Sequence, residues 1–92
     1  MPDWQAIFPA LEDGGIVAVG WVPPRAVGGG DISAAWRVAT RTGAAFVKTA
    51  RADDFERLDA EADGLEALRQ AGALRVPEVL TCGTAGGDAF LA

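Results

Sequence analysis

Residues 28–48, GGGDISAAWRVATRTGAAFVK, join a glycine-rich turn to two strand-like segments and end on a lysine. Residues 32–40 are strand-like, because one set of side chains (Ala34, Trp36 and Val38) alternates with another (Ala35, Arg37 and Ala39). A Thr-Gly pair then predicts a tight turn into a second strand over residues 44–49. The stretch therefore predicts an antiparallel hairpin that carries Lys48 near its far end.

Two elements are expected before this hairpin. Asp3 can cap a short helix over residues 4–11, which Pro9 bends or shortens and which should stop before the first pair of glycines. Residues 16–22 are strand-like. The two prolines that follow either end this strand or confine it to an edge of the sheet.

One long helix and two strands are expected after the hairpin. Residues 53–71 predict the helix, which two aspartates open and Gly72 ends. Apolar side chains at three- and four-residue spacing predict its buried face: Phe55, Leu58, Ala62, Leu65 and Leu68. Extended segments over residues 76–82 and 89–92 flank a glycine-rich turn at residues 83–87. This order predicts an α+β fold, with an antiparallel five-stranded sheet, one long helix packed on it and a short N-terminal helix before it.

The whole chain, residues 1–92, has the size of one small domain, and half of its residues are hydrophobic, so a packed core is expected. No apolar stretch approaches the roughly 20 residues that a membrane span requires, and no secretory signal is expected at the start. The net charge of −5 argues against a nucleic-acid partner, because binding a phosphate backbone requires a basic face. A nucleotide remains possible, since it needs only one or two local positive charges and oriented amides.

Three residue types are absent from the chain: histidine, asparagine and tyrosine. Without histidine there is no imidazole base, no Ser-His pair and no histidine metal ligand. The single cysteine, Cys82, excludes an internal disulfide and a cysteine zinc site, and it fits a cytoplasmic location. The chain is therefore not expected to be a competent enzyme on its own, and no catalytic or metal-binding residue is assigned within it.

Lys48 is the only lysine in the chain, and it ends an apolar run. A single lysine at a strand end is usually a solvated charge, but alternation places Lys48 on the same sheet face as Phe46. Glu61 lies within the apolar stripe of the long helix, three residues after Leu58 and four before Leu65. A carboxylate there either reaches water at the edge of the stripe or needs a partner. A Lys48–Glu61 ion pair would explain both positions.

The glycine-rich turn has two interpretations. It consists of Gly28, Gly29, Gly30, Asp31, Ile32 and Ser33. Three consecutive glycines leave the backbone amides unobstructed, so the chain can lie against a polyanion. Taken alone, such glycines are more typical of a flexible hairpin turn. Their place between two expected strands, upstream of the strand that carries Lys48, favours phosphate binding.

The glycine-rich turn, the strand lysine and the helix glutamate follow one another along the chain. In this order they resemble the N-terminal lobe of the fructosamine kinase (ketosamine-3-kinase) family, within the protein-kinase-like and aminoglycoside-phosphotransferase-like superfamily. The resemblance rests on residues 28–38, 45–48, 60–69 and 74–80, and it extends over residues 4–92. Together these motifs are fairly specific. The lysine and the glutamate alone would fit any domain of the superfamily.

The resemblance implies an ATP-dependent phosphotransferase that phosphorylates ketosamine sugar adducts, on small molecules or on glycated proteins, and so serves deglycation. It also implies that residues 28–33 cover the nucleotide phosphates, that Lys48 binds the α and β phosphates, and that Glu61 holds Lys48 in place. The catalytic aspartate and the ligands of Mg²⁺ belong to the C-terminal lobe of the family, which has no counterpart in these residues. The chain is thus expected to be a truncated nucleotide-binding lobe, inactive alone.

Two alternatives stay open at this point. The chain could be the corresponding lobe of another small-molecule kinase of the same fold, such as an aminoglycoside or choline phosphotransferase. It could also be a non-catalytic acidic interaction module, in which the glycine turn and the helix only serve folding. The residues of a second lobe would separate the two kinases, because acceptor specificity is built there.

Overall fold

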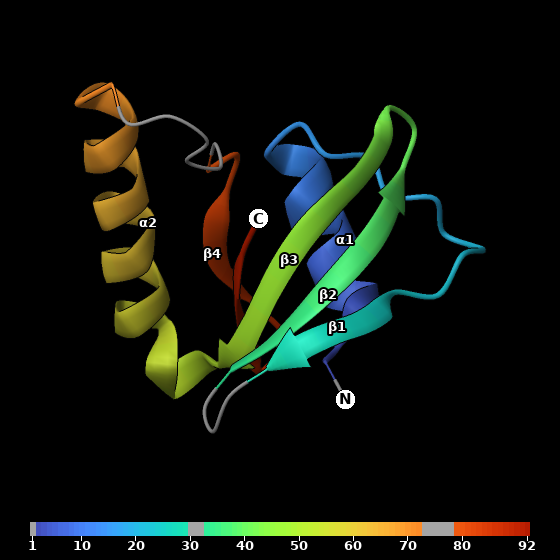
Figure 1. Ribbon diagram of the computed structural model, residues 1–92. Coiled ribbons are helices and arrows are strands. Elements are labelled where there is room, and N and C mark those ends of the chain that lie inside the picture. Colours follow the sequence, from blue (N-terminus) through green and yellow to red (C-terminus); the bar gives the residue numbers. More distant parts are fainter. Residues whose placement is uncertain (1, 30–32, 73–78) are drawn as a thin grey trace.

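The computed structural model describes residues 2–29, 33–72 and 79–92 (Figure 1). Its elements follow the chain in this order: α1 (Trp4–Asp13), β1 (Arg25–Gly29), β2 (Ser33–Thr40), β3 (Gly43–Arg51), the short 3₁₀ helix η1 (Ala52–Asp54), α2 (Phe55–Gln70), β4 (Cys82–Ala85) and β5 (Asp88–Leu91). The strands form one sheet in the order β1-β2-β3-β5-β4, and every neighbouring pair is antiparallel. The predicted fold class is confirmed: a five-stranded antiparallel sheet with one long helix and a short N-terminal helix.

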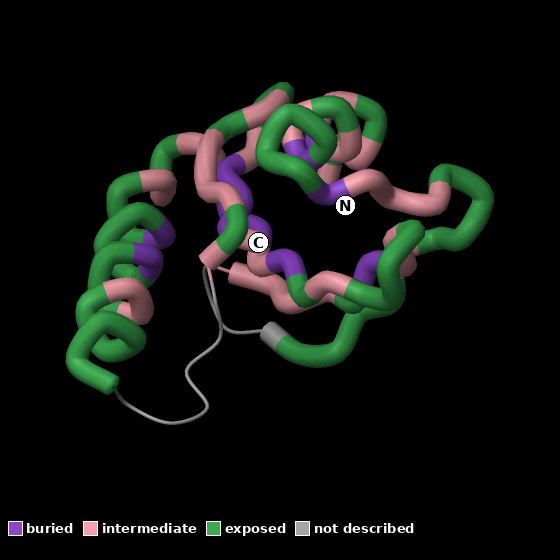
Figure 2. Tube along the Cα trace, turned by 90° about the horizontal axis from the view of Figure 1, so that it is seen from above, coloured by how far each residue is buried: buried purple, intermediate pink, exposed green. Residues whose placement is uncertain are grey.

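The central strand, β3, separates two hydrophobic cores that lie on opposite faces of the sheet. Val47 packs into the core under α1, and Ala50, three residues later, packs into the core under α2. An odd separation along a strand means opposite faces, because side chains alternate with a period of two. The α1 core consists of Ile7, Leu11, Ile16, Val38, Val47 and Phe90, and the α2 core of Ala50, Leu58, Ala62, Ala89 and Leu91. In Figure 2 the buried residues of α2 lie on the side of the helix that faces the strands.

α1 begins where the sequence predicts, because the Asp3 carboxylate accepts a hydrogen bond from the Ala6 amide at 3.3 Å and caps the helix. The helix continues past Pro9 and ends two residues beyond its expected end. Pro9 removes only one helical hydrogen bond. Ile7 and Leu11, one turn apart, are both fully buried, and this burial holds the helix together across the proline.

The start of α1 is tied to the hairpin between β4 and β5. The Asp3 amide donates a hydrogen bond to the Asp88 carboxylate at 2.8 Å, across 85 positions of sequence. Gly86, in the hairpin turn, has a φ of +60°, and a Cβ there would lie 2.8 Å from a carboxylate oxygen of Asp3. The backbone conformation and the neighbouring cap therefore both require glycine at this position.

The strand predicted over residues 16–22 is wrong. Only Ala18 forms a bridge there, with Thr40 of β2, and the Val22 amide donates to the Val19 carbonyl at 3.1 Å in a turn. Two prolines follow directly, and since they have no amide hydrogen to donate, the segment cannot continue along the sheet. The place of this strand is taken by β1, which begins immediately after the prolines.

The glycine-rich turn predicted over residues 83–87 is also wrong, because β4 occupies most of it. Gly83 pairs with Phe90, and a Cβ at Gly83 would lie 3.3 Å from the Phe90 ring. The missing side chain at Gly83 gives the ring room to pack against β4. The turn shrinks to two glycines, of which Gly86 supplies the positive φ.

The extended segment predicted over residues 76–82 is only partly described, since residues 76–78 lie outside the described part of the chain. Leu80 and Thr81 do not belong to a strand. They nevertheless run beside the end of β5, because the Leu80 amide donates to the Ala92 carbonyl at 2.9 Å and the Ala92 amide donates to the Thr81 carbonyl at 2.8 Å. β4 starts one residue later.

α2 buries Leu58 and Ala62 and half-buries Phe55 and Leu65, as the apolar spacing predicts. Leu68 departs from that prediction, because 53% of its surface is exposed. The sixteen residues of α2 span about 24 Å, whereas β4 and β5 have four residues each and span about 13 Å. The last turns of α2 therefore have no strand beneath them.

The two leucines of unequal burial offer a matched test of the cores. Leu11→Ala should lower the free energy of unfolding by about 2–5 kcal/mol, because it leaves a cavity in the α1 core. Leu68→Ala should change it by no more than about 0.5 kcal/mol, since the side chain is already largely in water. Urea denaturation monitored by circular dichroism measures both. Equal effects of the two substitutions would contradict the packing described here.

Candidate functional site

Lys48 lies at the centre of a cross-strand row that runs the width of the sheet. Ala35 of β2 and Leu91 of β5 are its direct partners in register. Gly28 of β1 lies beyond Ala35, and Cys82 of β4 lies beyond Leu91, so each strand contributes one residue to what we call the Lys48 row. Directly opposed residues point to the same face of a sheet. Leu91 belongs to the α2 core, so the Lys48 row faces α2.

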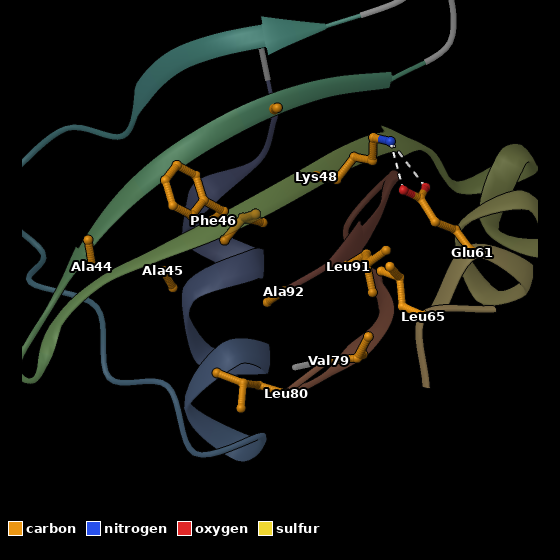
Figure 3. Close-up of a pocket in the computed structure, with 12 residues that line it drawn as sticks. Ala44, Ala45, Phe46, Lys48, Glu61, Leu65, Val79, Leu80, Leu91 and Ala92 are labelled. Carbon is orange, nitrogen blue, oxygen red and sulfur yellow. Dashed lines mark hydrogen bonds and ion pairs between the residues drawn. The ribbon is translucent and has the colours of Figure 1, made fainter. Parts of the chain in front are cut away.

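The structure brings Lys48 together with Glu61 of α2. The Lys48 ammonium donates hydrogen bonds to both carboxylate oxygens of Glu61, at 3.0 Å to Oε1 and 3.1 Å to Oε2 (Figure 3). Glu61 reaches the ammonium because its neighbours Leu58 and Ala62 hold α2 against the sheet. The side chains of Lys48 and Glu61 remain 36% and 40% exposed, so the pair forms a polar rim that water and ligands can reach.

An ion pair this exposed contributes little to stability. Pairs of this kind are worth about 0–1 kcal/mol, because water screens the charges and ordering two long side chains opposes the attraction. Another ion pair among the described residues, Glu66–Arg69 at 3.5 Å, joins two side chains of one helix. Lys48 and Glu61 instead join a strand to a helix, which fixes the ammonium above the sheet face. The ion pair therefore contributes more to the position of the Lys48 ammonium than to the stability of the fold.

A pocket of about 330 Å³ opens beside this pair, on the same face of the sheet (Figure 3). Apart from Lys48 and Glu61 it has an apolar lining: Ala35, Ala44, Ala45, Phe46, Val47, Leu65, Val79, Leu80, Leu91 and Ala92. Phe46 is 67% exposed, and Leu80 is about half exposed. The pocket thus combines an apolar floor with one charged end, an arrangement suited to a ligand that is apolar and planar at one end and anionic at the other.

The glycine-rich segment reaches the site through Gly28, the β1 member of the Lys48 row. Gly28 is exposed, and a Cβ built there would meet no atom within 4 Å. Neither neighbouring side chains nor a positive φ require glycine at this position. Gly29 and Ser33 end β1 and begin β2, while the candidate residues Gly30, Asp31 and Ile32 lie outside the described part of the chain.

Sequence reasoning found the charged end of the pocket and missed most of its apolar lining. Ala35 could have been found, because it pairs with Lys48 once the predicted hairpin is drawn in register. Val79 and Leu80 lie in the predicted extended segment over residues 76–82, but the sequence does not indicate which of its side chains face the pocket. Alternation correctly predicts that Phe46 lies on the Lys48 face, whereas its 67% exposure is evident only from the structure.

Cys82 closes the Lys48 row on the far side and packs against the α2 core, as expected for a small apolar side chain. Burial raises the pKa of the Cys82 thiol above its ordinary value of 9.0, and the negative charges of Asp59 and Asp63 raise it further. The thiol is therefore held in its protonated, unreactive form. The described residues contain no group of three or more side chains that could hold a metal ion.

Within the same described ranges, no helix is both long and apolar enough to cross a bilayer.

Comparison with known proteins confirms the resemblance that the motifs indicate. A family model described as fructosamine kinase matches residues 4–92. A protein of Vibrio vulnificus (strain CMCP6), named as a probable ketoamine kinase, is 28% identical over 88 residues, which are 96% of this chain and 31% of that protein.

Among solved structures, the crystal structure of a protein from Haemophilus somnus 129PT, which carries the provisional name fructosamine-3-kinase, has the same fold. It superposes with a TM-score of 0.76 at 24% sequence identity, over 96% of this chain and 30% of that chain. The chain thus spans about a third of the length of the relatives it matches.

The raised pKa of Cys82 predicts a pH dependence of stability. The folded chain keeps the thiol proton to a higher pH than the unfolded chain, so this contribution to stability is present below 9.0 and is lost as the pH rises through the raised pKa. Asp59→Asn should lower that pKa, and the alkylation rate of the thiol by iodoacetamide should then rise at a lower pH. A pH–rate profile that is unchanged in Asp59→Asn would contradict the influence of that carboxylate.

The exposure of the Lys48–Glu61 pair predicts a weak energetic coupling. A double-mutant cycle with Lys48→Met and Glu61→Gln should give a coupling energy of about 0–1 kcal/mol in urea denaturation, and added salt should reduce it. A coupling of several kcal/mol that salt does not change would mean that the pair is shielded from water.

Proposed function

The chain belongs to the fructosamine kinase family, and on that premise we propose that it is the nucleotide-binding lobe of an ATP-dependent phosphotransferase that acts on ketosamines. One observation carries the proposal: the Lys48 ammonium is held by both oxygens of Glu61 at the charged end of an apolar pocket. A lysine fixed in this way by a helix carboxylate is the arrangement that positions nucleotide phosphates in kinases.

Lys48 would act as a phosphate ligand. An ammonium has three N–H donors, and two of them point to the Glu61 oxygens, so the third can donate to an oxygen of the α or β phosphate. Glu61 would position Lys48 and would not itself touch the nucleotide. The apolar floor beside them, which includes Phe46 and Leu80, suits a purine ring, because a flat apolar surface is best buried against apolar side chains.

The glycine-rich segment, Gly28 to Ser33, would cover the phosphates from the opposite side. Gly28 stands two strands from Lys48 in the same row, which corresponds to about 10 Å across the sheet. A glycine that neither packing nor backbone conformation requires is explained if the backbone itself approaches a ligand closely. Gly29, Gly30, Asp31 and Ile32 would complete this cover.

The remaining chemistry would come from a second lobe. We assign residues 1–92 to one lobe, because relatives of this family are about three times as long as the chain. Phosphoryl transfer needs a base near the acceptor hydroxyl and Mg²⁺ to neutralise the phosphates when it is bound, and we assign neither the base nor the metal ligands to this chain. The acceptor would be a ketosamine on a small molecule or on a glycated protein, so the activity would serve deglycation. Such an enzyme would work in the cytoplasm, where ATP is available.

A chimera tests the proposal directly. The chain is fused to the portion of the Vibrio vulnificus relative that follows its matching segment, and ATP-dependent phosphorylation of a synthetic fructosamine is measured. We expect turnover that depends on both lobes, and a loss of about 100-fold or more in kcat/KM for Lys48→Met. Glu61→Gln should lose less, because the amide keeps one hydrogen-bond acceptor for the ammonium.

The matched control is Arg57→Gln, an exposed change on α2 that should leave turnover unchanged. A folded chimera that turns over at the same rate with Lys48→Met would refute the role of this lysine. The acceptor in this experiment is set by the Vibrio vulnificus lobe, so the chimera tests the nucleotide site of this chain and not its acceptor.

A further inference from the structure

Positive charge is concentrated in one half of this acidic chain. Residues 14–52 carry five basic side chains and one acidic side chain, a net charge of +4, although the whole chain has a net charge of −5. The basic residues are Arg25, Arg37, Arg41, Lys48 and Arg51. This segment forms β1, β2 and β3, whereas most of the acidic residues belong to α2 and its surroundings. The three-stranded half of the sheet therefore attracts anions more strongly than the overall charge suggests.

Within this half, two arginines face each other directly. Arg25 of β1 and Arg37 of β2 are partners in register, and both are exposed. Like charges directly opposite each other on neighbouring strands are destabilising. The next charged cross-strand pair in the sheet, Arg51 of β3 with Asp88 of β5, combines opposite charges. The Arg25–Arg37 pair therefore carries an electrostatic penalty that folding alone does not explain.

No acidic side chain of the described residues relieves this repulsion. The ion pairs within these residues are Lys48–Glu61 and Glu66–Arg69, and neither includes Arg25 or Arg37. Within the described residues, the exposed side chains of Arg25 and Arg37 therefore have neither an ion-pair nor a side-chain hydrogen-bond partner.

The two arginines lie on the pocket face of the sheet. Arg37 is two residues from Ala35 of the Lys48 row, so both side chains point to the same face. On its other side Arg37 is the register partner of Phe46, whose exposed ring lines the pocket. Phe46 lies two residues from Lys48, which places the arginine pair about 7 Å along the strands from the Lys48 row.

We propose that Arg25 and Arg37 form a second anion site, at the rim of the pocket and separate from Lys48, that takes a phosphate-type oxyanion. Cβ atoms of directly opposed residues are about 5 Å apart, so two planar guanidinium forks can converge on one tetrahedral group. A dianion neutralises both charges, whereas a carboxylate neutralises only one, and this favours phosphate.

Nuclear magnetic resonance on the 92-residue chain tests the site with inorganic phosphate at constant ionic strength, adjusted with sodium chloride. We expect saturable shifts of the Arg25 and Arg37 backbone amides and side-chain Nε–H groups. Arg37→Gln and Arg25→Gln should each weaken phosphate binding by roughly tenfold or more, as expected when one charged hydrogen-bond partner is lost. Shifts that grow linearly without saturation, or that chloride reproduces, would overturn the proposal.

Two control variants separate this site from its surroundings. Arg57→Gln removes an exposed arginine of α2 and should leave the phosphate affinity unchanged. Lys48→Met should leave the shifts at Arg25 and Arg37 in place, so a failure of the nucleotide site and a failure of this site give different results. Loss of those shifts in Lys48→Met would assign the bound phosphate to Lys48 and refute a separate site.

Thermal unfolding gives an independent readout. In phosphate-free buffer of low ionic strength, Arg37→Gln should melt at a higher temperature than the parent chain, because the repulsion between the arginines is gone. Phosphate should stabilise the parent chain and leave Arg37→Gln nearly unchanged, so the difference between the two should shrink or reverse. Equal stabilisation of both proteins by phosphate would count against the arginine pair.

Discussion

The strict two-residue alternation of β3 is the constraint on which the rest of the molecule depends. Val47 and Thr49 point into the α1 side of the sheet, while Phe46, Lys48 and Ala50 point to the α2 side. One strand therefore supplies both cores and the charged end of the pocket. A slip of one residue in its register would bury the ammonium under α1 and expose Val47, so the packing of the α1 core enforces the position of the lysine.

The helix opposite β3 is positioned by its apolar contacts and not by its ion pair. Leu58 and Ala62 are buried against Leu91 and Ala89, and these contacts set the distance and the rotation of α2 relative to the sheet. Glu61 lies between them in sequence and is carried to the Lys48 ammonium by that packing. A partly exposed ion pair is too weak to hold two elements together, whereas it can adjust freely to a third charged group.

Much of this arrangement could be predicted from the sequence, because it depends on local signals. The hairpin of β2 and β3 follows from alternation and a Thr-Gly turn, and the juxtaposition of Lys48 and Glu61 follows from a carboxylate within an apolar stripe. What failed depends on neighbours distant in the sequence. Leu68 fits the stripe, but the short strands below α2 do not reach it. Gly83 belongs to a strand because β4 pairs with β5, where Gly83 is opposite Phe90.

The apolar lining of the pocket shows the same limit. Leu80 and Ala92 come together through hydrogen bonds between the two extended segments, and the sequence does not indicate this pairing. The arginine pair does not follow from the sequence pattern either, because that pattern predicts the first strand at residues 16–22 and not at the residues that carry Arg25. The sequence predicts the correct number of strands but places the first one at the wrong residues. Which side chains face each other on neighbouring strands depends on that placement.

The bond between the Asp3 amide and the Asp88 carboxylate has a consequence for how the chain acquires its structure during synthesis. α1 leaves the ribosome before β4 and β5, yet the α1 core contains Phe90, and the turn that receives the helix cap contains Gly86. The 85 positions between the two aspartates take roughly 4 to 17 s to translate at 5–20 residues per second. During that interval Ile7 and Leu11 have no finished surface to pack against, which makes the nascent amphipathic helix a candidate for transient protection by chaperones.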